Sequence, residues 1–517
     1  MIQTKKDTEM SCVPGGDADA ETQSKNLALD RLLSGFYMLF VLVALSIWFL
    51  PIRAPLWLDE TSSYWSIAGG FKQIWGRSVV INSFPTYSYI LWLTSVVFGS
   101  KEIVLRIPSL LAMLAATLIL YRSARELFSK DVAAIATVVF ILDIRIAFAA
   151  IDVRPYAFAI LATTAAIFSF LRWSKTQNVR YAALFGVTSA GVFYFHYLFG
   201  CCMVAAFALA YFLERWHSPV GGLRQLLVAV GCFVPLIVPV LANILDVNRR
   251  RNQFVFTAGP TLKDLLHAVG PGVVPYAVAG VVFVAALTRK LSTPHLRNWR
   301  QFMLCAAFAV VPIVSLYGIS AMTPLHIFID RYQAVAVPGI ALCWAWIFSQ
   351  IDSRLQRVLG CALLVTWTAF LYYTWPQARS HGYTWKYALE FADANAIQDG
   401  APLVICSDYP GADFRDMPIE SAKDSDLFAP LSYYPVRVPV VPMPRALNGQ
   451  AKLIGRKFFL QAALAHQRFL VVCFRPSYPT LEWFVNLTSV THVARVLGSF
   501  DGIAVVEFEP KNRLGTP

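Results

Sequence analysis

The stretch LLSGFYMLFVLVALSIWFLP, residues 32–51, decides the fold class because it runs for 20 residues without a charge. As an α-helix it is long enough to cross roughly 30 Å of hydrocarbon. A polar leader with Lys5, Lys6, Lys25 and Arg31 precedes it, and no small-residue cleavage site follows it. We therefore expect a retained membrane anchor after a cytoplasmic tail.

Similar apolar stretches recur along the 517-residue chain, of which 57% is hydrophobic and only 15% is charged. This composition is too apolar for one soluble core. Stretches of this length favour helices over a barrel as the spanning element, and the sequence predicts a polytopic α-helical membrane protein with about 11 transmembrane helices. The expected spans are 32–51, 104–121, 132–149, 155–172, 181–197, 199–214, 225–243, 271–288, 302–320, 334–349 and 356–375.

The net charge of +13 arises mostly in short loops, without the aromatic-rich basic face that a nucleic-acid-binding domain uses. Basic loops favour the cytoplasmic side. They all fall on one side if FPTYSYILWLTSVVFG, residues 84–99, lies at the membrane interface and does not cross. The expected domains are a cytoplasmic tail at 1–31, a transmembrane domain at 32–375 with a large outer loop at 52–103, and an extracytoplasmic domain at 376–517.

The segment after about residue 376 has ordinary polar content and short β-rich runs. Amphipathic helical patterns precede two of these runs, which predicts a small extracytoplasmic α/β domain. Cys406 and Cys473 are its only cysteines. We favour two separate buried strand cysteines over a disulfide, which stays open as the alternative. The β-rich runs are PLVICS (402–407), RFLVVCF (468–474) and GIAVVEFEP (502–510).

Charged residues gather at the predicted outer ends of the helices, where a charge near hydrocarbon needs a partner or a function. Two adjacent acids, Asp59 and Glu60, lie in LWLDETSSYW, residues 56–65. Three arginines at 249–251 depart from the positive-inside tendency, and a guanidinium group matches phosphate oxygens in two-point contact. Acids beside a phosphate-binding group indicate chemistry on a lipid-linked phosphate. The remaining groups contain Asp143, Arg145, Asp152, Arg154, Tyr156, His196, Tyr197, Asp330, Arg331 and Tyr332.

Several segments within about 50–340 occur in an order and spacing that resemble bacterial members of the dolichyl-phosphate-mannose protein mannosyltransferase superfamily. They are PLWLDETSSYWSIA, SKEIVLRIPSLLAML, YRSARELF, DVRPYAFAIL, FYFHYLFG and DRYQAVAVPGIAL. This superfamily includes the lipid A aminoarabinose transferases and has the C-type glycosyltransferase fold. The resemblance implies an inverting extracytoplasmic transferase that takes a sugar from a polyprenyl monophosphate.

The resemblance also implies roles for residues of this chain. The family's first-loop acid falls on Asp59, the expected general base, with Glu60 beside it, and the second-loop acid falls on Asp152. Many relatives carry His-Pro-Pro before the interfacial aromatic stretch, whereas this chain has NSFPTY at 82–87, so contacts in that loop are expected to differ. The residues expected at the donor phosphate are Arg154, Tyr156, Arg331 and Tyr332; we add Arg250 from the outer arginines, and His196 and Tyr197 as substrate-binding candidates.

The expected reaction is a direct displacement on the sugar, in which protein cations stabilise the departing lipid phosphate. No cofactor is then obligatory, although the paired acids leave a divalent metal open. The expected partners are the polyprenyl-phosphate sugar, the bilayer, and a lipid, cell-wall glycan or protein acceptor, with no nucleic acid. The expected location is the bacterial inner membrane.

Other interpretations compete with each of these. Asp59 and Glu60 also suit the start of a helix, where acids complement the dipole. Asp152 and Arg154, like Asp143 and Arg145, also suit a structural pair, and the three arginines also suit anionic head groups. Two other functions remain: a polysaccharide polymerase or ligase that uses diphosphate-linked donors, and a transporter, which would place ionisable residues near the bilayer midplane.

Overall fold

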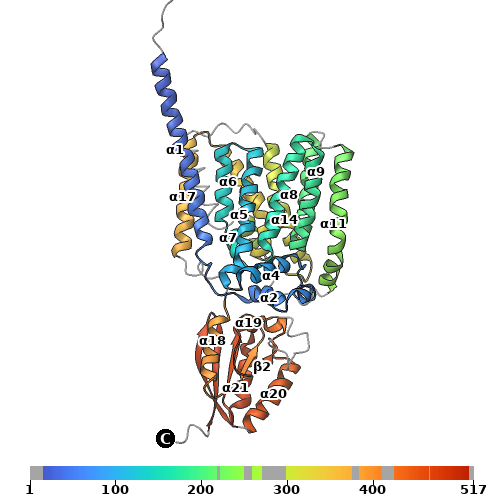
Figure 1. The fold of residues 1–517 in the computed structure, drawn as a ribbon, viewed down its shortest axis with the longest axis vertical. Helices are drawn as coiled ribbons and strands as arrows, with labels where there is room; N and C mark the ends of the chain where they lie inside the picture. Colours follow the sequence, from blue (N-terminus) through green and yellow to red (C-terminus); the bar gives the residue numbers. More distant parts are fainter. Residues whose placement is uncertain are drawn as a thin grey trace, which may run out of the picture.

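The computed structural model describes residues 16–217, 222–249, 259–269, 299–374, 383–409, 424–464 and 466–511. These residues form a helical bundle with a smaller sheet domain beneath one of its ends (Figure 1). A mostly helical membrane fold with a C-terminal α/β domain was predicted from the sequence, and this prediction is confirmed.

The long helices of the bundle follow the apolar stretches of the sequence. Among the described residues, eight helices are long and apolar enough to cross a membrane, or nine if α6 and α7, bent by 67°, form one span. They are α1 (Gly16–Trp48), α5 (Glu102–Leu127), α6 (Lys130–Leu142), α7 (Ile144–Ile151), α8 (Tyr156–Thr176), α10 (Tyr197–His217), α11 (Leu223–Arg249), α14 (Trp299–Met322), α15 with α16 (Asp330–Gln333, Val337–Ser349) and α17 (Arg354–Thr374). The shorter apolar helix α9 (Val179–Phe195) packs beside α8.

Each predicted span that falls on described residues is therefore helical. The predicted span at 271–288 lies outside the described residues, so the total of about 11 stays a prediction. A short amphipathic helix, α12 (Leu262–Val269), lies between α11 and α14 in the sequence.

The first loop, predicted at 52–103, holds short helices that lie across one end of the bundle (Figure 1). At 13 residues, α4 (Thr86–Phe98) is roughly 20 Å long, too short to cross a bilayer. Its last turn exposes Val96, Val97 and Phe98, as expected for a helix with an apolar face at an interface. The other elements of this loop are α2 (Leu58–Ala68), η1 (Phe71–Gln73) and α3 (Ile74–Val80).

The sheet domain has five strands in the order β2-β1-β3-β5-β4. β1 pairs in parallel with β2 and β3, and β5 pairs antiparallel with β3 and β4. The three predicted strands correspond to β1 (Leu403–Cys406), β3 (Phe469–Phe474) and β5 (Ile503–Pro510); β2 (Val440–Met443) and β4 (His492–Phe500) were not predicted. The other elements are α18 (Lys386–Ala396), η7 (Asp426–Phe428), α19 (Ala429–Tyr433), α20 (Gly449–Leu464), η8 (Arg475–Ser477) and α21 (Tyr478–Thr488).

The strands β1 and β3 are apolar along their whole length and almost entirely buried, as expected for inner strands covered on both faces. Cys406 and Cys473 lie on the neighbouring strands β1 and β3 as buried free cysteines. The predicted pair of buried strand cysteines is thus the state that the structure shows.

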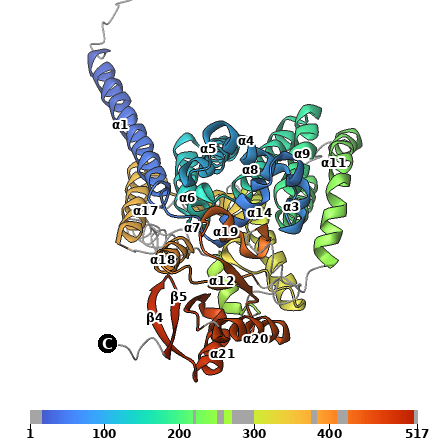
Figure 2. The same ribbon diagram turned by 60° about the horizontal axis from the view of Figure 1, so that its bottom comes forward.

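One hydrophobic core joins the sheet domain to the first loop. Leu56, Trp57 and Leu58 belong to the same buried cluster as the central strands. The Leu56 N–H donates to the Tyr434 hydroxyl at 2.7 Å, and α19 packs on α2. Figure 2, which brings this end of the bundle forward, shows α19 lying over it. The sheet domain is therefore seated on the loop that carries Asp59.

Candidate active site

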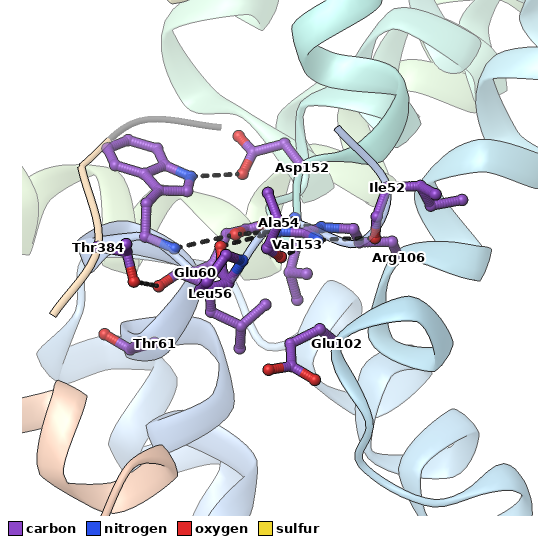
Figure 3. A network of polar contacts seen from close by, with 12 residues as sticks. Ile52, Ala54, Leu56, Glu60, Thr61, Glu102, Arg106, Asp152, Val153 and Thr384 are labelled. Carbon is purple, nitrogen blue, oxygen red and sulfur yellow. Dashed lines mark hydrogen bonds and ion pairs between the residues drawn. The ribbon is translucent and has the colours of Figure 1, made fainter. Parts of the chain in front are cut away.

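Glu60 is buried at the start of α2, where its side chain binds backbone N–H groups and an arginine. Its carboxylate accepts from the Trp57 N–H at 3.1 Å and the Val153 N–H at 2.9 Å. It also forms an ion pair of 2.8 Å with Arg106 of α5, and both side chains are fully buried. Arg106 in turn donates to carbonyl oxygens of the chain before α2, those of Ile52 at 2.9 Å and Ala54 at 2.5 Å. Figure 3 shows this network.

The Glu60 network therefore joins three segments that are distant in sequence: the chain before α2, helix α5, and the turn after α7. Glu60 does not line the cavity described below. The sequence placed Glu60 among the catalytic candidates. In the structure its contacts hold neighbouring segments together, and its catalytic role stays a prediction.

Asp59 points to a different side of α2 from Glu60, because successive residues of a helix point about 100° apart. Its carboxylate lines a cavity and forms a 2.5 Å ion pair with Arg331 at the start of α15. Both side chains are partly exposed, at 20% and 26%. Arg154 donates to the Asp59 carbonyl oxygen at 3.4 Å. Three of the predicted site residues therefore meet, although they come from loops far apart in the sequence.

Burial lowers the pKa of Arg154, but the combined effect of Asp59 and other nearby groups raises it by more. The net shift of the Arg154 pKa is therefore upward. Arg154 therefore carries a firm positive charge beside the Asp59–Arg331 pair. Two guanidinium groups therefore lie beside the Asp59 carboxylate at this corner, and both can donate hydrogen bonds to an anionic ligand.

Asp152 lies just behind this corner, at the end of α7, and is fully buried. Its carboxylate accepts from the Trp57 indole N–H at 3.1 Å, which fixes the ring over which Arg331 lies at 5.6 Å. The Ser109 hydroxyl donates to the Asp152 carbonyl oxygen at 2.6 Å. Asp152 does not line the cavity. Its carboxylate contacts Trp57, and its predicted catalytic role stays a prediction.

Three predicted site residues that line the cavity, Tyr156, His196 and Tyr332, form an aromatic cluster. The His196 ring centroid lies 5.3 Å from that of Tyr156 and 5.2 Å from that of Tyr332. The ring nitrogens of His196 and the two tyrosine hydroxyls are groups that can form hydrogen bonds.

The cavity has a volume of about 480 Å³. Its lining includes the charged side chains of Asp59, Arg154 and Arg331. It also includes apolar side chains, mainly from the ends of α10 and α11 and from the chain before α15, which are called the apolar arm below. Tyr197 lines this arm, while Arg250 lies outside the described residues. The apolar arm includes Phe195, Leu198, Ile244, Val247, Leu325 and Ile327.

Asp143 and Arg145, the other charged pair singled out from the sequence, contact each other and backbone groups. Asp143 caps the start of α7 and forms a 2.7 Å ion pair with Arg145, and both are buried. Arg145 also donates to the Ala268 carbonyl oxygen at 3.2 Å. Within the described ranges, no three His, Cys, Asp or Glu side chains are grouped to hold a metal ion.

Sequence reasoning missed Arg106 and the contribution of the sheet domain. A charge inside the apolar run of α5 was a usable signal, because a buried guanidinium requires a carboxylate or several carbonyl oxygens. No comparable signal marks Tyr409 or Asp426, which reach the cavity only because the sheet domain packs on α2.

Asp408 is a buried acid beside this junction, and its behaviour predicts a pH effect on stability. Burial raises its pKa to about 6, with Asp59 adding to the rise. In the unfolded chain the pKa of an aspartic acid is about 3.9. Because the pKa of Asp408 is higher in the folded protein, the folded state loses stability as the pH rises from the unfolded to the folded pKa. We therefore expect the melting temperature of Asp408→Asn, minus that of wild type, to increase from pH 4 to pH 7.

The measurement is thermal unfolding in lipid nanodiscs at each pH. Asp501→Asn, at an exposed turn of the same domain, is the matched control and should follow wild type. A constant difference between Asp408→Asn and wild type across this pH range would contradict the prediction.

Comparison with known proteins agrees with this description. Residues 82–241 match the family model described as dolichyl-phosphate-mannose-protein mannosyltransferase. No curated protein matches the chain significantly. Among solved structures, ArnT from Cupriavidus metallidurans bound to undecaprenyl phosphate aligns with a TM-score of 0.55 and 13% identity, over 92% of this chain and 98% of that chain.

Two further alignments have lower scores. Arabinofuranosyltransferase AftD from Mycobacteria gives a TM-score of 0.49 at 11% identity, over 93% of this chain and 40% of that one. The Archaeoglobus fulgidus oligosaccharyltransferase in complex with Zn and sulfate gives 0.46 at 14%, over 92% and 73%. The alignment with ArnT shows that the chain has the C-type glycosyltransferase fold. The resemblance to the dolichyl-phosphate-mannose protein mannosyltransferase superfamily is confirmed over residues 82–241.

Proposed function

We propose that this protein is a membrane glycosyltransferase that takes a sugar from a polyprenyl monophosphate and transfers it, with inversion, to an acceptor hydroxyl outside the cytoplasm. The observation that carries this is the Asp59–Arg331 pair, which places a carboxylate beside a guanidinium group in a cavity that also has an apolar lining. The matched family model, and the undecaprenyl phosphate bound to ArnT, support the same donor class.

The cavity suits a lipid-linked phosphate in both charge and polarity. The apolar arm would accept the first isoprene units, because its lining side chains gain by losing contact with water. Arg331 and Arg154 would bind the phosphate, since a guanidinium fork pairs with two phosphate oxygens. Tyr156, Tyr332 and His196 add hydrogen-bonding groups close to these cations.

Binding of the donor would also prepare the base. A phosphate group competes with Asp59 for Arg331, and the displaced carboxylate is then free to accept a proton. In the transfer step, the acceptor oxygen forms a bond to the anomeric carbon and the bond from that carbon to the phosphate oxygen breaks. The acceptor proton passes to Asp59, and the electron pair leaves on the polyprenyl phosphate, where Arg331 and Arg154 stabilise its charge.

The arrangement of the bundle supports an extracytoplasmic site. Helix α1 enters from the end of the bundle opposite to the sheet domain (Figure 1). Arg172 and Lys175 lie in the last turns of α8, and both pair with Glu126 near the end of α5. These helix ends belong to the end of the bundle far from α2. Basic loops favour the cytoplasmic side, so the proposed location is a bacterial inner membrane with the sheet domain outside.

The donor class can be tested with membranes that contain the intact protein. We expect transfer of labelled sugar from a polyprenyl monophosphate and none from the matching diphosphate, because the polar corner offers two guanidinium groups. A chelator should not reduce the rate, since protein cations alone stabilise the leaving group.

Transfer only from the diphosphate donor would favour a polymerase or ligase. No transfer from either donor would favour a transporter. Loss of activity in the chelator, restored by a divalent ion, would show that a metal is required.

A further inference from the structure

The sheet domain contributes side chains to the active-site cavity. Tyr409, just after β1, and Asp426, at the start of η7, both line it together with Asp59 and Ser62 of α2. Because Ser62 follows Asp59 by three residues, the two side chains share one face of α2. This part of the cavity is called the junction rim below, and it comprises Asp59, Ser62, Tyr409 and Asp426.

The junction rim is held rigidly. The Tyr409 hydroxyl donates to the Leu58 carbonyl oxygen at 2.7 Å and makes a short hydrogen bond with the Ser62 hydroxyl. The Trp65 indole N–H donates to the Asp424 carbonyl oxygen at 2.8 Å, two residues before Asp426. These hydrogen bonds tie the segments that carry Tyr409 and Asp426 to α2, the helix that carries Asp59.

Among the described residues that line the cavity, a second carboxylate comes from the sheet domain. Asp59 pairs with Arg331, and Arg154 and Arg331 line the cavity together with the aromatic cluster, whereas Asp426 brings its carboxylate from η7. A phosphate bound at the arginines leaves the junction rim with acids, a hydroxyl and a phenol ring. Carboxylates accept hydrogen bonds from sugar hydroxyl groups, and they repel a second anion.

We infer that the junction rim is the acceptor subsite and that it selects a neutral carbohydrate over an anionic one. This inference rests on the proposed function and adds the acceptor class to it. The acceptor sugar lies against Tyr409, with one hydroxyl toward Asp59 and another hydrogen-bonded to the Asp426 carboxylate. An acceptor with a carboxylate or phosphate on this sugar is disfavoured by Asp426.

The test compares two acceptors that differ by one charge, octyl glucoside and octyl glucuronide, each with a polyprenyl-monophosphate donor. Wild type should favour the neutral glycoside in kcat/KM. Asp426→Lys should lower this preference about tenfold, with Asp426→Asn between the two, because the repulsion is removed or reversed. The KM for the donor should not change.

Asp424→Asn is the matched control, because it removes an equal charge two residues away at an exposed position that does not line the cavity. It should keep the wild-type preference. An unchanged preference in both Asp426 variants, or a wild-type preference for the glucuronide, would overturn the acceptor assignment.

Two results separate this inference from the proposed function. Transfer to acceptors already present in the membranes, but not to octyl glucoside, would overturn the acceptor assignment alone. No transfer from any monophosphate donor to any acceptor would overturn the proposed function itself.

Discussion

Asp59→Asn is expected to reduce sugar transfer by about 100- to 10,000-fold, the range typical for loss of a general base. Asparagine keeps the size of the side chain and can still accept a hydrogen bond from Arg331. It cannot take the acceptor proton, so the loss should appear in kcat more than in the KM for the donor. The measurement is transfer of labelled sugar by membranes with equal amounts of each protein.

The matched control is Asp330→Asn. Asp330 adjoins Arg331 in sequence, but it is exposed and does not line the cavity, so its loss should leave transfer near the wild-type rate. Equal transfer by wild type and Asp59→Asn would reduce Asp59 to a residue that only starts α2 and pairs with Arg331. A loss in both variants would point to the local charge balance instead of a base.

Arg106→Met is expected to destabilise the protein by about 3–5 kcal/mol, the cost of leaving one member of a buried ion pair alone. The substitution leaves the Glu60 carboxylate without its cation, and it removes the donor to the carbonyl oxygens of Ile52 and Ala54. Thermal unfolding in nanodiscs, followed by tryptophan fluorescence, measures the effect. Adding Glu60→Leu should recover part of it, because the unpaired charge is then gone.

Lys175→Met provides the comparison for an exposed ion pair. Lys175 pairs with Glu126 at 3.2 Å, but its side chain is 61% exposed, and such pairs contribute no more than about 1 kcal/mol. Similar melting temperatures for Arg106→Met and Lys175→Met would contradict the structural role of the Glu60–Arg106 pair.

Much of the fold could be predicted because hydrophobic length carries strong physical information. A run such as 32–51 has few alternatives to a spanning helix. The shortness of α4 could also be read, because its apolar run begins at Pro85 and ends before Gly99. By contrast, β4 exposes most of its residues, so it lacks the alternating or continuous apolar pattern that marked β1, β3 and β5.

The site could be predicted only in part, for a geometric reason. The sequence indicated that Asp59 and Glu60 mattered, but adjacent helix positions face different sides, and only the packing of α5 decides that Glu60 is the buried one. Tyr409 and Asp426 depend on contacts more than 340 positions away, such as that between Tyr409 and Ser62 with a separation of 347. No local pattern encodes such a contact.

The core shared by the first loop and the sheet domain limits how this protein can be engineered. Leu56, Trp57 and Leu58 pack with the central strands, so grafting a foreign C-terminal domain onto this bundle would leave their apolar surfaces mismatched. A functional chimera must carry residues 52–69 and the sheet domain as one inseparable cassette.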